Sequence, residues 1–586
     1  MILTRILSRL LRRDSAAVTA NRRLDEWLQR GYRFQRNGEF EQARQLYLRV
    51  LKDAPHNVDA HYLLGALLGE SGELGEAGSH LEQALAVKPD FTDAYAALGN
   101  VRLLQGDEQA ALASYEQALL LDPNCAPAHS NLGLLHQRQG RTAAALQEFR
   151  LAYQVAPDLP DLLKNLTLAH INLEQYDAAL ALLDPVLLVQ PHNVEALKCK
   201  GFVLQKMHHP DLALGYYQTA RALVADDPEL LNNLGIVLQE LGDLDPAIEC
   251  YDEAISLRPD FPLAIWHRSL AYLLCHDFAR GWPDYELRSI SIDQPKRPQL
   301  CPQWDGAALK GRSILVYAEQ GLGDEIMFAS CLPDVIAASA HCVIDCSPKL
   351  ETMFRRSFPA ATVCATTPSR DFPAAVQDAG VELQTGAGSL PQYLRRSLAD
   401  FPRHDGYLRA DPRRETLWRE RLAQLGAGIK VGISWQGGTP KTRRQVRSLP
   451  LMRWLPILST PGVSFVNLQY TDCSLELAEF EVATGIKIAD WQEVRDDYEH
   501  TAALVSALDV VISVCTAVIH LGGALGRPVW IMAPFSPEWR YGFSGEKMPW
   551  YPSSRMFRQP AFGQWEPVID QVARELAILT ASGAAG

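Results

Sequence analysis

The amino-acid sequence predicts an α-helical superhelix followed by an α/β domain built from two lobes. Two patterns lead to this prediction. In the first half, small residues, alanines and prolines each recur with a fixed period of 34 residues, and in the second half short apolar strands alternate with helical stretches. A chain of 586 residues is also too long for a single hydrophobic core, so we expect several domains.

The composition limits the classes of function. Apolar residues make up 47% of the chain and charged residues 21%, as in ordinary globular proteins. The formal net charge of -13 opposes general binding of nucleic acid, because the phosphate backbone is repelled. The cysteines, 11 in all, show no zinc-binding spacing, which favours a reduced, cytoplasmic compartment and predicts no metal site. No apolar run approaches the roughly 20 residues that a membrane span needs.

Residues 1–23 form a basic amphipathic segment, in which arginines interleave with leucines and isoleucines up to residue 13. Two interpretations stay open. The segment makes weak contact with the inner face of a membrane, or it is a start helix or frayed tail next to the first repeat.

The 34-residue period covers residues 24–290, in about eight units. The glycine series is Gly31, Gly65, Gly99, Gly133, Gly201 and Gly235, with Thr167 and Ser269 at the two remaining positions. We expect the small residue on the first helix of each unit to let the second helix approach closely. The alanine series, from Ala43 to Ala247, accepts the neighbouring unit, and the proline series, from Pro55 to Pro259, ends each second helix. Position 225 lacks the expected proline, which predicts a distorted junction between the sixth and seventh units.

This pattern resembles the tetratricopeptide repeat, whose arrays form a concave binding groove. Asn131, Asn165 and Asn233 each lie two residues before the small position, and so share one helix face. Their amides are suited to hold the backbone of an extended peptide, although a tolerated polar residue explains them equally simply. The arrangement resembles the superhelical groove of protein O-GlcNAc transferases and implies a protein acceptor bound by the repeats.

The second half divides into a linker (291–312), a first Rossmann-like lobe (313–425), a second Rossmann-like lobe (426–555) and a C-terminal helix (556–586) that packs back on the first lobe. Strands are expected at 313–318, 341–346, 430–435, 463–468, 509–514 and 528–533. Strands that alternate with helices favour parallel sheets covered on both faces. Two such sheets bind a ligand in the cleft at the carboxyl ends of their strands.

The first candidate site is the turn 319–325, directly after the first strand. Gly321 and Gly323 let the backbone approach a ligand, and Asp324 stands at the strand end that faces the cleft. The alternative is that Asp324 only stabilises a helix N-terminus through the helix dipole. The turn lacks the third glycine of a dinucleotide-binding fingerprint, which disfavours a nicotinamide or flavin oxidoreductase.

Two further candidate sites lie in the second lobe. The loop 437–448 follows a strand and carries Lys441 and Arg447 among its cations, which suits a pyrophosphate, although a solvated basic loop is the alternative. In the segment 513–528, Thr516 is placed to cap a helix whose N-terminus faces the cleft, and His520 follows one turn later. The alternative for His520 is a histidine packed in the wall between the lobes.

The segments "EQGLGDEIMFAS", "WQGG…RSLPL" and "SVCTAVIHLGGALGRPVW" together resemble the tetratricopeptide-fused relatives of the ADP-heptose:lipopolysaccharide heptosyltransferases. The resemblance implies a GT-B fold of the family 9 type and an inverting, metal-independent mechanism. It also implies Asp324 as catalytic base, and Arg447 and Lys441 as ligands of the donor phosphates. Cys515 stands where that family has aspartate, which suggests a different donor or weakened catalysis.

The predicted function is therefore a glycosyltransferase that moves a sugar from a nucleotide-sugar donor to Ser or Thr of a protein held by the repeats. The nucleotide-sugar is the substrate, and no cofactor is expected. One alternative is transfer to a glycolipid or oligosaccharide. The other is a non-enzymatic repeat scaffold with a degenerate transferase domain, which Cys515 favours.

Overall fold

The computed structural model describes residues 18–159, 161–290, 297–366, 372, 376, 380–438 and 444–583. The chain forms two compact units, Met1–Leu223 and Val224–Gly586. The basic segment up to residue 17 lies outside the described residues, and so does its predicted contact with a membrane or the first repeat.

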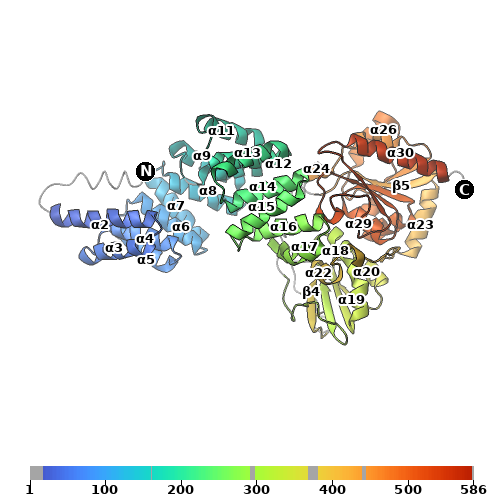
Figure 1. The fold of residues 1–586 in the computed structure, drawn as a ribbon, viewed down its shortest axis with the longest axis horizontal. Helices are drawn as coiled ribbons and strands as arrows, with labels where there is room; N and C mark the ends of the chain where they lie inside the picture. Colours follow the sequence, from blue (N-terminus) through green and yellow to red (C-terminus); the bar gives the residue numbers. More distant parts are fainter. Residues whose placement is uncertain are drawn as a thin grey trace. The chain divides into compact units, whose positions relative to one another are not determined.

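The first unit is a succession of helix pairs with the predicted 34-residue spacing (Figure 1). Its helices are α2 (Val18–Arg36), α3 (Phe40–Asp53), α4 (Val58–Glu70), α5 (Leu74–Val87), α6 (Thr92–Leu104), α7 (Glu108–Leu121), α8 (Ala126–Arg138), α9 (Thr142–Val155), α10 (Leu162–Asn172), α11 (Tyr176–Val189), α12 (Val194–Lys206) and α13 (Pro210–Leu223). The alanines of the periodic series are fully buried on the second helices.

The periodic glycines make the helix pairs close, as the sequence predicts. A Cβ atom on Gly99 would lie 2.4 Å from the Tyr115 ring, and one on Gly133 would lie 2.5 Å from the Phe149 ring. The fifth unit has Thr167 at this position, and its hydroxyl donates to the Leu163 carbonyl 2.8 Å away within the same helix. Such short approaches leave no room for a side chain, so the spacing of the helices depends on these small residues.

The division between the units falls at the junction that the missing proline marks. Helix α13 ends at Leu223, and α14 begins at Pro228. The Asp227 side chain caps α14 by accepting hydrogen bonds from the backbone N–H groups of Glu229 and Leu230. The second unit therefore begins with its own repeats, α14 (Pro228–Leu241), α15 (Leu244–Leu257), α16 (Pro262–Leu274) and α17 (Phe278–Tyr285).

The first lobe contains a four-stranded parallel sheet of order β3-β2-β1-β4. Its strands are β1 (Ser313–Tyr317), β2 (His341–Cys346), β3 (Thr362–Ala365) and β4 (Leu383–Gly386), and its helices are α18 (Leu322–Phe328), α19 (Leu332–Ala338), α20 (Glu351–Ser357) and α22 (Leu390–Leu394). The predicted linker is more ordered than expected from residue 297 onward. Gln303 pairs with Gln384 of β4 in a parallel bridge, and Trp304 is buried.

The second lobe contains a five-stranded parallel sheet of order β6-β5-β7-β8-β9. Its strands are β5 (Ile429–Ser434), β6 (Val463–Asn467), β7 (Val510–Val514), β8 (Val529–Ala533) and β9 (Ser554–Arg558). Its helices are α23 (Pro412–Ala423), α24 (Arg444–Arg447), α25 (Leu455–Leu458), α26 (Ser474–Thr484), α27 (Gln492–Asp496), α28 (Tyr498–Ala507), α29 (Ala517–Ala524) and α30 (Glu566–Gly583).

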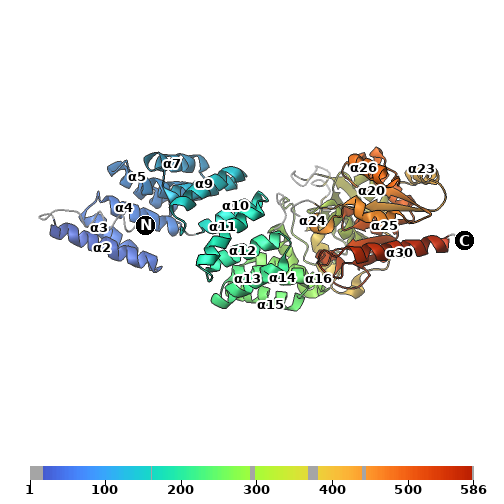
Figure 2. The ribbon, with the colours of Figure 1, turned by 90° about the horizontal axis from the view of Figure 1, so that it is seen from above.

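Two helices belong to a different lobe from the one that the sequence predicts. Helix α30 packs on the second lobe, not the first, because its apolar face (Val568, Ile569, Val572 and Leu576) joins the core formed by β5 and β7. Figure 2 shows α30 alongside α25 of that lobe. Helix α23, placed by the sequence in the first lobe, packs against α28 of the second. Both helices are amphipathic, and amphipathicity alone does not say which sheet they cover.

Candidate functional site

The two lobes meet where helices α18 and α29 pack side by side (Figure 1). Helix α18 follows β1, and α29 follows β7, so both begin at the carboxyl ends of central strands. Gly323 makes this contact close, because a Cβ there would lie 3.1 Å from Cδ2 of His520 and 3.4 Å from Cα of Ala517. Gly321 is the N-cap residue of α18. The predicted contact of these two glycines with a donor stays a prediction.

A chain of alternating charges crosses this contact between the lobes. The guanidinium of Arg540 donates from Nη2 to Oδ1 of Asp324 at 2.6 Å, and Arg540 also forms an ion pair with Glu538. Oε1 of Glu538 in turn accepts from Nη1 of Arg447 at 2.6 Å. The structure therefore links Asp324 and Arg447, predicted separately from distant segments, through two residues that the sequence analysis missed.

Glu538 and Arg540 lie in the segment after β8, and Trp539–Tyr541 forms a short 3-10 turn there. Neither a glycine motif nor a run of cations marks this segment in the sequence. The one signal that points to them is their position after the carboxyl end of a parallel strand, the criterion that also identified Asp324 and Arg447.

Arg447 lies against the glycines of its own loop. Gly438 adopts a φ of +82°, and a Cβ there would lie 2.1 Å from Nη2 of Arg447, so only glycine leaves room for the guanidinium. The Arg447 side chain is 12% exposed. Lys441, the second predicted cation, lies outside the described residues.

Thr516 is the N-cap residue of α29 by position, but its side chain does not cap the helix. Its hydroxyl instead shares a hydrogen bond of 3.1 Å with Ser513, and the residue is buried. The predicted side-chain cap is therefore wrong, because the hydroxyl is engaged with Ser513 on the strand side.

His520 is buried in the contact between the lobes, and its Nδ1 lies 3.0 Å from the Tyr551 hydroxyl. Burial lowers the pKa of His520 well below its ordinary value, and the charges of Arg540 and Arg447 lower it further. The imidazole is therefore neutral at physiological pH. Its placement agrees with the packed alternative, and its predicted contact with a donor stays a prediction.

Cys515 is buried beside this network. Burial raises the pKa of its thiol to about 11, although the charges of Arg447, Arg558 and Arg540 favour the thiolate. The thiol therefore carries no charge at neutral pH.

A cavity of about 280 Å³ opens next to the start of α29. Leu322 and Lys349 from the first lobe face Tyr470, Arg495 and Thr516 from the second across it. Arg495 is held by Asp490 at 2.5 Å. The cavity lies at the carboxyl ends of β1, β6 and β7, which is the expected position of a ligand between two parallel sheets.

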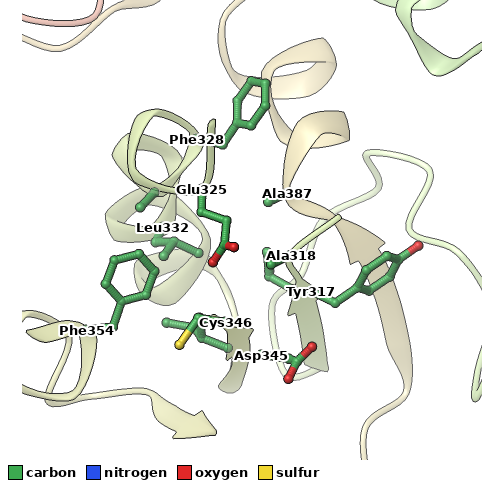
Figure 3. A pocket seen from close by; sticks show the side chains of 12 residues that line it. Tyr317, Ala318, Glu325, Phe328, Leu332, Asp345, Cys346, Phe354 and Ala387 are labelled. Atoms are coloured by element: carbon green, nitrogen blue, oxygen red, sulfur yellow. The ribbon is translucent and has the colours of Figure 1, made fainter. Parts of the chain in front are cut away.

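A second cavity, of about 20 Å³, lies inside the first lobe and is shown in Figure 3. The Glu325 carboxylate lies in it among Leu332, Ala318 and Phe328, and accepts a hydrogen bond of 2.9 Å from the Ser347 N–H. Burial raises the pKa of Glu325 to about 8. A space of this size holds about one water molecule, so it is part of the protein interior and too small for a substrate.

The asparagines of the predicted peptide groove lie on the first helices of their units, at α8, α10 and α14. Asn131, Asn165 and Asn233 are each half-buried. Asn131 and Asn165 belong to the first unit and Asn233 to the second, and their predicted binding of a peptide stays a prediction.

Within the described residues, no group of three or more histidine, cysteine or acidic side chains is arranged to hold a metal ion. In that same part of the chain, every helix is too short or too polar to cross a membrane.

The fold and the family models together show tetratricopeptide repeats in the N-terminal half, followed by a C-terminal α/β domain. Models described as tetratricopeptide repeat match residues 35–101, 126–159 and 228–261, and one described as TPR repeat matches residues 99–140. These matches confirm the repeats of the N-terminal half, and such repeats indicate binding of a protein partner.

Among individual proteins, the chain is similar to Protein FlbA of Caulobacter vibrioides, with 34% identity over 339 residues. The match covers 55% of this chain and 56% of FlbA, so the chain spans about half the length of that curated relative. Among solved structures, a tetratricopeptide repeat protein from Parabacteroides merdae is 16% identical over 42% of this chain and 98% of that chain, with a TM-score of 0.36. The TPR protein YrrB is 24% identical over 32% of this chain and 98% of its own, with a TM-score of 0.26.

Proposed function

We propose that the protein is a glycosyltransferase, which transfers a sugar from a nucleotide-sugar donor to a Ser or Thr hydroxyl of a protein bound by the repeats. One observation carries the proposal. Asp324, an acid at the carboxyl end of β1, pairs with Arg540 of the second lobe, and Glu538 links Arg540 to Arg447. A cavity of about 280 Å³ opens at the same ends of the strands, where Leu322 and Thr516 line it. An inverting transfer needs such a base on one side of the reacting carbon and cations on the other.

In this mechanism the donor occupies the cavity between the lobes, with its diphosphate near Arg447. The Asp324 carboxylate takes the proton of the acceptor hydroxyl, and the hydroxyl oxygen forms a bond to the anomeric carbon. The bond between that carbon and the phosphate oxygen breaks, and the departing nucleoside diphosphate is stabilised by Arg447. Lys441 has the same predicted role.

Donor binding is tested by the thermal stability of the full chain with nucleoside diphosphates and with CMP-, UDP-, GDP- and ADP-sugars. A ligand that binds the folded state stabilises it by about 2.7 kcal/mol at a hundredfold excess over its Kd. We expect one nucleotide class to raise the Tm, and the shift to be lost in Arg447→Ala. Arg453→Ala is the matched control, because Arg453 pairs with Glu566 away from the site.

A second candidate function, a non-enzymatic scaffold, is favoured by the uncharged Cys515 beside the arginines. In that case the repeats bind a protein partner and the α/β domain has lost its donor. Absence of a Tm shift with every nucleotide and nucleotide-sugar would overturn the transferase proposal in favour of this one.

A further inference from the structure

We propose that Arg447 and Arg540 together form one binding site for a phosphate or pyrophosphate group, and that Glu538 occupies this site as an internal competitor when no ligand is bound. The inference deepens the proposed function and rests on it for the choice of ligand. Neither Arg540 nor Glu538 belongs to the three motifs that suggested that function.

Glu538 bridges the two arginines with its two carboxylate oxygens. Its Oε1 accepts from Arg447 at 2.6 Å, and its Oε2 pairs with Arg540. One carboxylate thus gives one oxygen to each of two guanidinium groups. Two non-bridging oxygens of a phosphate can take the same two positions, because arginine binds carboxylate and phosphate with the same planar fork.

Positive charge exceeds negative charge among the described side chains around Glu538. Arg447, Arg540 and Arg558 lie around Cys515, which is uncharged, and the acids in the network are Asp324 and Glu538. The Arg558 guanidinium donates to the backbone carbonyls of Tyr541, Gly542 and Gly545, at 2.6 to 2.9 Å. With Glu538 displaced, these described side chains amount to three cations and one acid, and a dianion neutralises the excess positive charge.

Arg540 has a hydrogen-bond donor that is not used within the described residues. The Nε atom of Arg540 is buried and has no acceptor within the described residues. A buried donor without an acceptor is costly, and such atoms commonly mark a place that a ligand or water fills. A phosphate with three oxygens can accept a hydrogen bond from this Nε atom, whereas the carboxylates of Asp324 and Glu538 do not.

Glu538 is the most exposed of the four charged side chains in this network, so it can move away from the arginines most easily. Its side chain is 28% exposed, against 21% for Asp324, 15% for Arg540 and 12% for Arg447. It also lies outside regular structure, directly before the 3-10 turn. Arg540, in contrast, is fixed next to Trp539, which packs against Trp282 and Trp550. Exchange of Glu538 for a ligand therefore needs only a side-chain rotation.

The test is titration calorimetry of the full chain with inorganic pyrophosphate, in parallel with UDP, GDP and ADP. If Glu538 competes, then Glu538→Gln binds pyrophosphate at least about fivefold more tightly than the wild type, because the competent state is no longer suppressed. Arg540→Gln binds it at least about tenfold more weakly, and Arg540→Lys, which keeps the charge, lies between. Glu546→Gln is the control, because Glu546 pairs with Arg555 and is 61% exposed.

An unchanged or weaker affinity in Glu538→Gln would overturn the inference, and so would absence of pyrophosphate binding to every variant. Circular dichroism melts of each variant separate loss of binding from loss of folding. The proposed function fails separately. If a nucleotide-sugar binds the wild type and Arg447→Ala loses it, while the Glu538 and Arg540 variants bind normally, the transferase stands and the internal competitor does not. A nucleoside diphosphate that binds more tightly than pyrophosphate identifies a nucleotide as the source of the anion.

Discussion

The position of Asp324 is the residue-scale observation that most directly supports the proposed proton transfer. It lies in the first turn of α18 at the end of a central strand, and its carboxylate is 21% exposed and oriented by Arg540. Asp324 is held by one arginine and keeps part of its side chain exposed, so it can accept a proton from an acceptor hydroxyl, as the proposed function requires.

Asp324→Asn should therefore reduce sugar transfer by about 10²- to 10⁴-fold, the usual contribution of a general base. The amide keeps the size of the side chain but takes no proton, and the loss of its charge beside Arg540 should not weaken the binding of an anionic donor. The measurement is single-turnover transfer with the donor identified by the nucleotide panel, together with the Tm shift of the same variant. Wild-type turnover in Asp324→Asn would show that the base assignment is wrong.

A second residue-scale prediction concerns the repeats. In Gly99→Ala the new methyl group meets the Tyr115 ring at 2.4 Å, so either the ring or the helix pair α6 and α7 must shift. We expect a loss of about 1–3 kcal/mol from overpacking. Hydrogen exchange of the amides in α6 and α7 measures this local loss.

Gly75→Ala is the matched control. Gly75 lies in helix α5 with open space around its Cβ position, so the same substitution should stabilise that helix by about 0.5–1 kcal/mol. Equal effects of the two substitutions would contradict the close-approach role of Gly99.

At the scale of the elements, equivalent histidines in two repeats have different hydrogen-bond partners. In α8, Nε2 of His129 donates to the Pro123 carbonyl, and its Nδ1 lies 2.6 Å from a Glu148 carboxylate oxygen. Two units earlier, His61 makes the same contact to Pro55, but its Nδ1 lies 3.0 Å from His80. The hydrogen bond to Glu148 raises the pKa of His129, whereas burial and the neighbouring His61 lower the pKa of His80.

The pKa of His129 is thus higher in the folded chain than its unfolded value of about 6.5. Its contribution to stability is complete below that pH and is lost as the pH rises through the folded-state pKa. His129→Gln should cost about 1–2 kcal/mol at pH 6 and less at pH 8.5. Urea unfolding by circular dichroism at both pH values measures the difference. A cost that is constant with pH would contradict a charged hydrogen bond.

The elements differ in how far their sequence reveals them. The repeats are predictable because the requirement for close helices recurs every 34 residues and selects small residues each time. Strands β4 and β9 are not predictable from the sequence, because Leu383–Gly386 and Ser554–Arg558 lack a continuous apolar run. The ion pair of Asp324 and Arg540 joins residues 216 positions apart, and no local pattern encodes such a contact.

At the scale of the whole molecule, the end of the repeats belongs structurally to the α/β domain. In the last repeat, Trp282 packs against Trp539 and Trp550, and Tyr285 packs against Trp539, next to Arg540. Just beyond that helix, the buried Arg288 donates to Glu319 of the Asp324 turn at 2.6 and 2.8 Å. Removal of this arginine would leave a carboxylate without its cation, which typically costs about 3–5 kcal/mol. The repeat boundary at 290, as the sequence suggests it, therefore cuts through a packed core.

This packing makes the position of a truncation decisive. A fragment of residues 224–586 keeps α14–α17 and should melt cooperatively. It should also bind the nucleotide-sugar donor, and either hydrolyse it or transfer the sugar to a small acceptor. A fragment of residues 297–586 lacks Trp282, Tyr285 and Arg288, so it should aggregate or melt without cooperativity. Calorimetric melts with and without the identified nucleotide compare the two fragments. Equal Tm values would show that the last repeat is dispensable for the α/β core.

If the repeats of the first unit hold the acceptor, the 224–586 fragment should also lose modification of the protein substrate while it keeps binding of the donor. Full modification of the protein substrate by that fragment would place acceptor recognition in the second unit.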